Sequence, residues 1–346
     1  ALPTSLASFA GGGFLSLFGK ARLLLEPFLP RGKDSDNESV ADFMSRRLGK
    51  EALEYLANPL LAGIYAAKPE TLCMRHTFPA IHDIEQKHRS LLLGKMSGYG
   101  TSEKLPQSRL VSFPSGMGEL TDRIKDTIKG NFIFEHTVTK VTSEKGKWQV
   151  FASDSSETEW SDVFDQVVCT LPAHRLGKIN WENVTQAEKI STLQEASHFP
   201  LSLVFQGFDQ NEVSHPLDGF GFLVPEVEKM EILGTLFSSS LFPGRAPSGK
   251  VLLTTFVGGE RNPELALADE KILCRKVTDR LSSLLGIRGQ PEFQRVKTWR
   301  ESIPLPDIGF DERKKAAETL RRENPGLSFS GSHFTGPPLP NCLDVD

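Results

Sequence analysis

The sequence lacks several features that would place it in common functional classes. Its four cysteines, Cys73, Cys169, Cys274 and Cys342, are scattered without a CxxC pair. This argues against a disulfide framework or a zinc site and suits a reducing compartment. The net charge of −4 gives no basic surplus, so no nucleic-acid partner is expected. No run of about 18 apolar residues is present, and Ala1–Leu25 lacks the basic start of a secretory signal.

A dinucleotide-binding fingerprint is also missing. That fingerprint is a strand, a GxGxxG turn and a helix, followed by an acidic residue about 20 positions later. The one glycine cluster near the start, Gly11–Gly13, follows Ser8–Ala10, which does not resemble a strand. We interpret this cluster as a loop or a helix break. The 346 residues are nevertheless enough for more than one domain and a sizeable core.

No side chains are spaced for a metal site or a catalytic triad. His76, His82 and His88 fall at intervals of six residues, whereas ligands on a helix need i, i+3 or i+4 spacing. Surface or packing histidines are therefore expected. We assign no catalytic residue and no metal ligand.

The stretch from Gly219 to Gly259 has the strongest β-strand character. Val251–Val257 is an almost unbroken apolar and β-branched run, and Leu233–Phe237 is a second one. Ahead of them, Gly219–Phe222 alternates glycine with phenylalanine, which suits a strand against which a flat, bulky group packs closely. Periodicity alone predicts the core of a sheet here.

Helices and further strands surround this stretch. Ala1–Pro30 predicts a helix with a wide apolar face, broken at Gly19; contact with a membrane surface or packing under another domain would explain that face. Glu264–Leu285 predicts a long amphipathic helix. Phe132–Val141, Trp148–Phe151 and Val163–Leu171 predict three strands of a β-meander.

A glycine-rich turn follows the last predicted strand, Leu327–Ser330. The turn begins at Gly331 and includes Gly336. A turn of this kind between a strand and a helix presents backbone N–H groups to an anion. The following Pro337 and Pro338 have no N–H to donate, which predicts fewer contacts of that kind.

Several motifs resemble, in order and spacing, those of the oxygen-dependent protoporphyrinogen oxidases, a family of flavin amine oxidases. The motifs are GFGFLVP from Gly219, LGTLFSS from Leu233, FPGRAP from Phe242 and TTFVGG from Thr254, with WRESIP from Trp299 and the glycine-rich turn after them. The resemblance extends from Leu2 to Asp344. One departure is Ala67–Lys68, where the family has Gly-Asp.

The resemblance implies an α/β fold, namely the two-lobed FAD-dependent amine-oxidase fold with an inserted α-helical domain. Residues 1–100 would form a helical, membrane-associating domain. Residues 113–193 and 301–346 would form part of the FAD-binding domain, and residues 101–112 and 194–300 the substrate-binding domain. The chain would begin after the family's first nucleotide-binding unit and stop before its last helix.

The implied activity is removal of six electrons from protoporphyrinogen IX by FAD, with molecular oxygen as acceptor and hydrogen peroxide as product. The flavin carries the chemistry and the protein supplies position and electrostatics. Coproporphyrinogen III oxidation, another amine-oxidase-type flavoprotein and an inactive protein of this fold remain alternatives. We further expect a cytoplasmic location, peripheral contact with the inner face of a membrane, and a homodimer.

The resemblance also assigns site residues. The expected cofactor-binding residues are Val138, Thr170, Trp299, Gly331, Gly336, Pro338 and Leu339. The expected substrate-binding residues are Gly63, Ile64, Leu223, Leu236 and Phe256. An apolar slot formed by these side chains suits a flat macrocycle.

Overall fold

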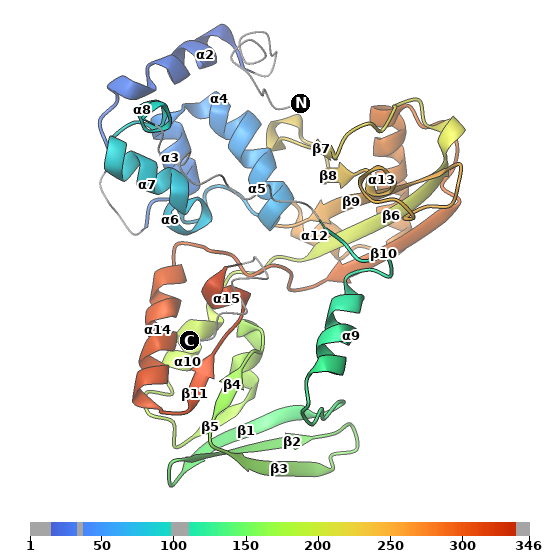
Figure 1. Cartoon of the computed structure of the whole chain (residues 1–346). Coiled ribbons are helices and arrows are strands. Elements are labelled where there is room, and N and C mark those ends of the chain that lie inside the picture. Colours follow the sequence, from blue (N-terminus) through green and yellow to red (C-terminus); the bar gives the residue numbers. More distant parts are fainter. Residues whose placement is uncertain (1–14, 33–36, 98–110, 337–346) are drawn as a thin grey trace. The chain divides into compact units, whose positions relative to one another are not determined.

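The computed structural model describes residues 15–32, 37–97 and 111–336 (Figure 1). The chain forms two compact units. Unit 1 comprises Ala1–Ser112 and His198–Ile303, and unit 2 comprises Phe113–Ser197 and Pro304–Asp346. Within the described residues, no helix combines the length and the apolarity needed to cross a membrane.

The first part of unit 1 is helical. Its helices are α2 (Leu17–Leu24), η1 (Glu26–Phe28), α3 (Val40–Arg47), α4 (Lys50–Ala52), η2 (Leu53–Ala57), α5 (Asn58–Tyr65), α6 (Met74–Thr77), α7 (Pro79–His88) and α8 (Leu91–Met96).

The predicted break at Gly19 is wrong, because α2 runs through it. Glu51 packs against this turn of α2, and its carboxylate accepts hydrogen bonds from the N–H and the hydroxyl of Ser16 at 2.7 and 2.6 Å. A Cβ at position 19 would collide with that carboxylate. Glycine is therefore present for close approach and not to end the helix.

A buried ionic cluster holds these helices together. The side chains of Glu26, Arg47 and Glu85 are fully buried, and Arg47 Nε lies 2.7 Å from Glu85 Oε1 and 3.5 Å from Glu26 Oε1. Arg46 donates to Glu85 Oε1 at 2.6 Å. Burial raises the pKa of Glu85, but the hydrogen bonds from Arg46 and Gly32 outweigh burial and leave that pKa below its ordinary value.

The second part of unit 1 is a five-stranded antiparallel sheet in the order β10-β6-β9-β8-β7. The strands are β6 (Leu201–Asp209), β7 (Gly221–Leu223), β8 (Ile232–Leu236), β9 (Lys250–Gly258) and β10 (Phe293–Trp299). The connecting helices are η4 (Gln210–Glu212), η5 (Glu226–Glu228), α11 (Ser238–Leu241), α12 (Pro263–Ala266) and α13 (Glu270–Leu285).

Helix α13 covers one face of this sheet (Figure 1). Val204, Phe208, Leu253 and Val257 of the sheet belong to one buried cluster with helix residues such as Val277. From Ser202 to Phe208 the burial of β6 alternates, because its even-numbered residues are buried, with Val204 and Phe208 in this cluster, while Leu203, Phe205 and Gly207 are half-buried on the other face. An antiparallel sheet tolerates this arrangement, in which only one face is fully covered.

Unit 2 contains a four-stranded sheet in the order β3-β2-β1-β5 and a two-stranded sheet that pairs β4 with β11 in parallel. The strands are β1 (Thr137–Glu144), β2 (Lys147–Ser153), β3 (Glu159–Phe164), β4 (Val167–Cys169), β5 (Asn180–Glu182) and β11 (Leu327–Phe329). The helices are α9 (Gly118–Thr127), η3 (Ala173–Lys178), α10 (Lys189–Gln194), α14 (Phe310–Glu323) and α15 (Ser332–Thr335).

The prediction of a single strand over Val163–Leu171 is wrong. The chain leaves β3 after Phe164 and enters β4 at Val167, so that one apolar run serves two sheets. Trp148 of β2 joins the parts of unit 2, since its fully buried ring lies in the core and its Nε1 donates to the carbonyl of Pro325 at 3.0 Å.

Candidate functional site

The sheet of unit 1 presents an apolar face opposite α13. Directly paired residues of an antiparallel sheet project to the same face. One cross-strand row is Leu223–Gly234–Phe256–Leu203–Lys297, and the next is Gly221–Leu236–Thr254–Phe205–Arg295. We call this surface, together with Leu252, the open face. The predicted substrate residues Leu223, Leu236 and Phe256 therefore lie on one surface.

The end of α5 borders the open face. A Cβ at Gly63 would lie 2.5 Å from Cδ2 of Leu223, so this glycine allows the helix to pack against β7. Ile64, the next residue, is 45% exposed. The helix ends at Ala66, which adopts a left-handed conformation (φ 54°), and the Ala66 carbonyl accepts a hydrogen bond from Glu260 N at 2.8 Å. These contacts fix the position of Gly63, an expected substrate-binding residue, relative to the sheet.

Hydrogen bonds and an ion pair between charged and polar side chains reinforce the contact between α5 and the sheet. Asn58 donates to Glu226 Oε2 at 3.1 Å and accepts from Arg261 at 2.6 Å. Lys68 Nζ lies 3.1 Å from Glu226 Oε1. Burial raises the pKa of Glu226, but these hydrogen bonds from Lys68 and Asn58 prevail and keep its pKa below the usual range. The lysine at the position where the resembled family has an acid therefore has an acidic partner on η5.

Two predicted cofactor residues of unit 2 lie at the same end of the parallel strands. Thr170 directly follows β4, and Gly331 follows β11 after Ser330. Cys169 is paired with Phe329, and Ser330 N donates to the Cys169 carbonyl at 3.0 Å. Ligands in α/β proteins bind outside the carboxyl ends of parallel strands, and this is where both residues lie.

Val138 shares a hollow with Thr170. The hollow has a volume of about 350 Å³ and a mostly apolar lining, to which Val141, Val150 and Trp181 also contribute. The pairing of β1 with β2 is irregular between Val138 and Lys140. Bulges of this type are common beside binding sites. An apolar hollow of this kind can take a planar aromatic group.

Gly331 and Gly336 flank α15, and the backbone conformation at both positions requires glycine. Their φ angles are +140° and +90°, which residues with a Cβ rarely adopt. A Cβ at Gly331 would also lie 2.8 Å from Cε1 of His333. The backbone can therefore approach a ligand closely at this turn. The glycine turn, the carboxyl strand ends and the apolar hollow suit a flavin dinucleotide.

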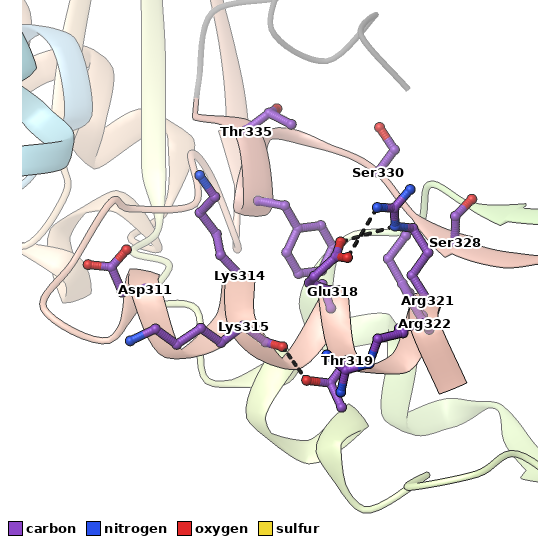
Figure 2. A pocket seen from close by; sticks show the side chains of 13 residues that line it. Asp311, Lys314, Lys315, Glu318, Thr319, Arg321, Arg322, Ser328, Ser330 and Thr335 are labelled. Carbon is purple, nitrogen blue, oxygen red and sulfur yellow. Dashed lines mark hydrogen bonds and ion pairs between the residues drawn. The ribbon is translucent and has the colours of Figure 1, made fainter. Parts of the chain in front are cut away.

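Figure 2 shows a second hollow in unit 2, which follows the side of β11. It has a volume of about 730 Å³ and is lined by α14, β11 and α15. Arg321 and Glu318 face each other in it, and Arg321 Nε lies 3.0 Å from Glu318 Oε2 (Figure 2). Ser330 and Thr335 place this hollow beside the Gly331 turn.

The remaining predicted cofactor residues are Trp299, Pro338 and Leu339. Trp299 ends β10 in unit 1 with 51% of its surface exposed. Pro338 and Leu339 lie outside the described residues. Two residues that we did not predict, Leu203 and Phe205 of β6, lie on the open face directly beside Phe256 and Thr254. Their alternation signals a strand, but pairing partners do not follow from the sequence.

The fold is that of the flavin-dependent amine oxidases. A crystal structure assigned to a protoporphyrinogen oxidase of Exiguobacterium sp. 255-15 superposes with a TM-score of 0.80 at 22% identity, covering 98% of this chain and 72% of that one. A putrescine oxidase superposes with a TM-score of 0.61 at 12% identity, covering 92% and 69%.

The chain belongs to the family described as flavin containing amine oxidoreductase, whose model matches residues 1–338. It is 32% identical to protoporphyrinogen oxidase 2 of Arabidopsis thaliana, over 97% of this chain and 72% of that protein. It is 33% identical to the mitochondrial protoporphyrinogen oxidase of Nicotiana tabacum, over the same shares. It is 30% identical to coproporphyrinogen III oxidase of Bacillus subtilis, over 99% and 73%.

The protein is therefore an FAD-dependent oxidoreductase. The predicted family resemblance, fold class and cofactor are confirmed.

Proposed function

We propose that the protein oxidises protoporphyrinogen IX to protoporphyrin IX. Six electrons and six protons leave the substrate, and three molecules of oxygen become three of hydrogen peroxide. FAD supplies the acceptor for electron pairs in this chemistry. The names of the relatives support the substrate class, and the open face supports it independently.

The open face is the single observation that carries this proposal. Leu203, Phe205, Leu236, Leu252 and Phe256 form a half-buried apolar surface on adjacent strands. Gly221 and Gly234 let β7 and β8 approach each other closely, since a Cβ at either position would collide with the backbone of the paired strand. A flat, apolar macrocycle can lie against such a surface and displace water from it.

We propose that these side chains bind and orient the macrocycle, and that none of them transfers a proton. Leu223 and Leu236 would flank one pyrrole ring and Phe256 would stack on another, with Gly63 and Ile64 at the border. On the cofactor side, Val138 and Thr170 would contact an aromatic ring system of FAD, and Gly331 and Gly336 would let the backbone approach the cofactor. Trp299, Pro338 and Leu339 complete the proposed cofactor set.

Porphyrin fluorescence tests the proposal. The purified protein, supplied with FAD, is mixed in air with protoporphyrinogen IX, coproporphyrinogen III or putrescine. We expect porphyrin to appear at a rate proportional to the protein concentration and above spontaneous oxidation. Hydrogen peroxide formation from putrescine without porphyrin formation would instead favour an amine oxidase. Faster turnover of coproporphyrinogen III would assign the protein to the other porphyrinogen.

Phe256→Ala is expected to weaken protoporphyrin binding by about 1–3 kcal/mol, because an aromatic contact and its buried area are lost. The dissociation constant is measured by fluorescence titration together with the free energy of unfolding. Phe208→Ala is the matched control, since Phe208 is fully buried on the α13 face. It should cost about 3–5 kcal/mol of stability while the remaining folded protein binds normally. Unchanged binding in Phe256→Ala would exclude the stacking role.

We also propose that α2, η1 and α8 contact a membrane surface. Five of their apolar side chains are at least 69% exposed: Leu17, Phe18, Leu24, Phe28 and Met96. Glu26 joins these elements, because its carboxylate accepts hydrogen bonds from Ser90 Oγ at 2.5 Å and from Leu91 N at 3.0 Å. Exposed leucine and phenylalanine at the surface of a short helix suit interfacial insertion.

The double variant Phe18→Glu with Phe28→Glu is expected to bind phospholipid vesicles at least about tenfold more weakly, since burial of one phenylalanine contributes about 1.5–3 kcal/mol. Sedimentation with neutral and anionic vesicles measures this. The control is Ile272→Glu with Leu284→Glu, which adds the same charge on exposed positions of α13. Equal vesicle binding by wild type and the phenylalanine double variant would exclude a membrane role for this patch.

A further inference from the structure

Two cations project from the edge strand β10 onto the open face. Lys297 is paired with Leu203, which is paired with Phe256, and Arg295 is paired with Phe205. Both cations are exposed. Each of the two cross-strand rows that carry the apolar surface therefore ends in a positive charge on the same edge of the sheet.

Neither cation has an acidic partner among the described residues, whereas other cations of this unit do. Lys250 lies 3.2 Å from Asp209 and 2.7 Å from Glu292. Arg280 of α13 lies 2.7 Å from Glu231. By contrast, Lys297 Nζ lies over the Trp299 ring, 4.8 Å from its centroid, and no carboxylate of the described chain is within ion-pair distance of it.

Cations on an edge strand also discourage pairing with another sheet, but that role does not require a particular face. Side chains alternate along β10, so Gln294, Val296 and Thr298 face α13, and Val296 packs against the core there. Both charges of the strand are on the other side, beside the apolar surface. A ligand lying on that surface would therefore meet both of them.

The spacing suits a ligand with two acidic arms. Residues i and i+2 of a strand are about 6.6 Å apart, and Phe256 is two strands, or about 10 Å, from β10. A planar ring over Phe256 and Leu236 would extend toward β10, and two carboxylate arms from one edge of the ring could reach Lys297 and Arg295.

We propose that Arg295 and Lys297 form a subsite for the carboxylate side chains of the substrate. The inference rests on the proposed function, since protoporphyrin carries two propionate arms on adjacent rings. The guanidinium of Arg295 can bind one carboxylate in bidentate fashion, and the ammonium of Lys297 can bind the other as a point charge. The apolar surface then supplies affinity, and the two cations set the orientation of the ring.

Titrations of the whole, FAD-supplied protein with protoporphyrin IX and with its dimethyl ester test this subsite. The variant Arg295→Gln with Lys297→Gln is expected to bind the free acid about 10- to 100-fold more weakly and to bind the ester with unchanged affinity. Each of the two lost contacts is an exposed or partly exposed charged hydrogen bond, which contributes up to a factor of about ten. Added salt should weaken acid binding by wild type but not ester binding.

Two controls separate a specific site from general charge. Arg295→Lys with Lys297→Arg keeps both charges and should restore most of the acid affinity. Lys271→Gln with Arg275→Gln removes two exposed cations from α13 and should leave both affinities unchanged.

The failure of the inference is distinguishable from failure of the proposed function. Equal loss of acid and ester binding, or no loss at all, in the Arg295/Lys297 variant would overturn the carboxylate subsite while wild-type binding still supports the function. Absence of binding of either porphyrin to wild type would overturn both.

Discussion

Gly259→Ala is expected to lower the free energy of unfolding by about 2–4 kcal/mol and to weaken protoporphyrin binding. Gly259 follows β9 with a φ of +62°, where a side chain costs about 1–2 kcal/mol. The new Cβ would also collide with the Ala66 carbonyl at the end of α5, and forced overpacking costs about 1–3 kcal/mol more. Since Gly63 is on this helix, its displacement should disturb the border of the open face.

Gly249→Ala is the matched control for this prediction. Gly249 also has a positive φ, +75°, but a Cβ at this position would meet no atom within 4 Å. It should therefore show only the conformational cost of about 1–2 kcal/mol and normal binding. Urea unfolding and porphyrin titration are measured on both variants. Equal effects of the two substitutions would mean that contact with α5 does not position the substrate residues.

Arg47→Met is expected to destabilise the helical part of unit 1 by about 3–5 kcal/mol. The substitution keeps most of the apolar stem but leaves the carboxylates of Glu26 and Glu85, both fully buried, without the charge between them. Removing one partner of a buried ion pair typically costs this amount, because an uncompensated charge stays in the interior. Arg46 still contacts Glu85, which keeps the expected loss from being larger.

Lys50→Met serves as the control for Arg47→Met. Its side chain is 83% exposed and pairs with Glu54 at 3.5 Å, so about 0.5 kcal/mol or less is expected. Hydrogen exchange or proteolysis of the α3 and α7 segments reports the effect locally. A loss below about 1 kcal/mol in Arg47→Met would show that the buried charges find other partners.

Stability should also depend on pH through Glu85. Its folded pKa is lower than its unfolded pKa, so its contribution is complete above the unfolded pKa and is lost as the pH falls through the folded one. The dependence of the free energy of unfolding on pH in the acidic range should therefore change in Glu85→Gln. If that dependence is unchanged, other carboxylates cause the unfolding at acidic pH.

Strands and helices with clear periodicity were predicted well from the sequence. The runs around Val251–Val257 and Leu233–Phe237 correspond to β9 (Lys250–Gly258) and β8 (Ile232–Leu236). The predicted long helix Glu264–Leu285 is divided, because α12 ends at Ala266 and Asp269 starts α13 as its N-cap, accepting a hydrogen bond from Lys271 N at 2.9 Å. A side-chain cap inside an apolar pattern is difficult to distinguish from a polar helix position.

The predictions that failed depend on contacts between distant segments. Gly19 is explained by Glu51, which is 32 positions away in the chain and accepts from Ser16. The division of Val163–Leu171 depends on β11, which pairs with β4 from more than 150 residues away. Local propensity contains no information about either partner.

The arrangement of the candidate site also depends on contacts between distant segments. Leu223, Leu236 and Phe256 could be proposed from motifs, but their common face follows only from the register of β7, β8 and β9. Leu203, which pairs with Phe256, is recognisable beforehand only as one apolar position of an alternating strand.

The most direct test of the proposed function is to mix the FAD-loaded protein with protoporphyrinogen IX in the absence of oxygen and to follow the absorbance of the flavin and of the porphyrin. If FAD accepts the electrons from a porphyrinogen bound by this protein, the flavin band should bleach as the porphyrin band grows, at three reduced flavins per porphyrin formed. Phe256→Ala at equal FAD content should require more substrate for the same rate. A flavin that stays oxidised, with porphyrin formed only when air is admitted, would contradict the account.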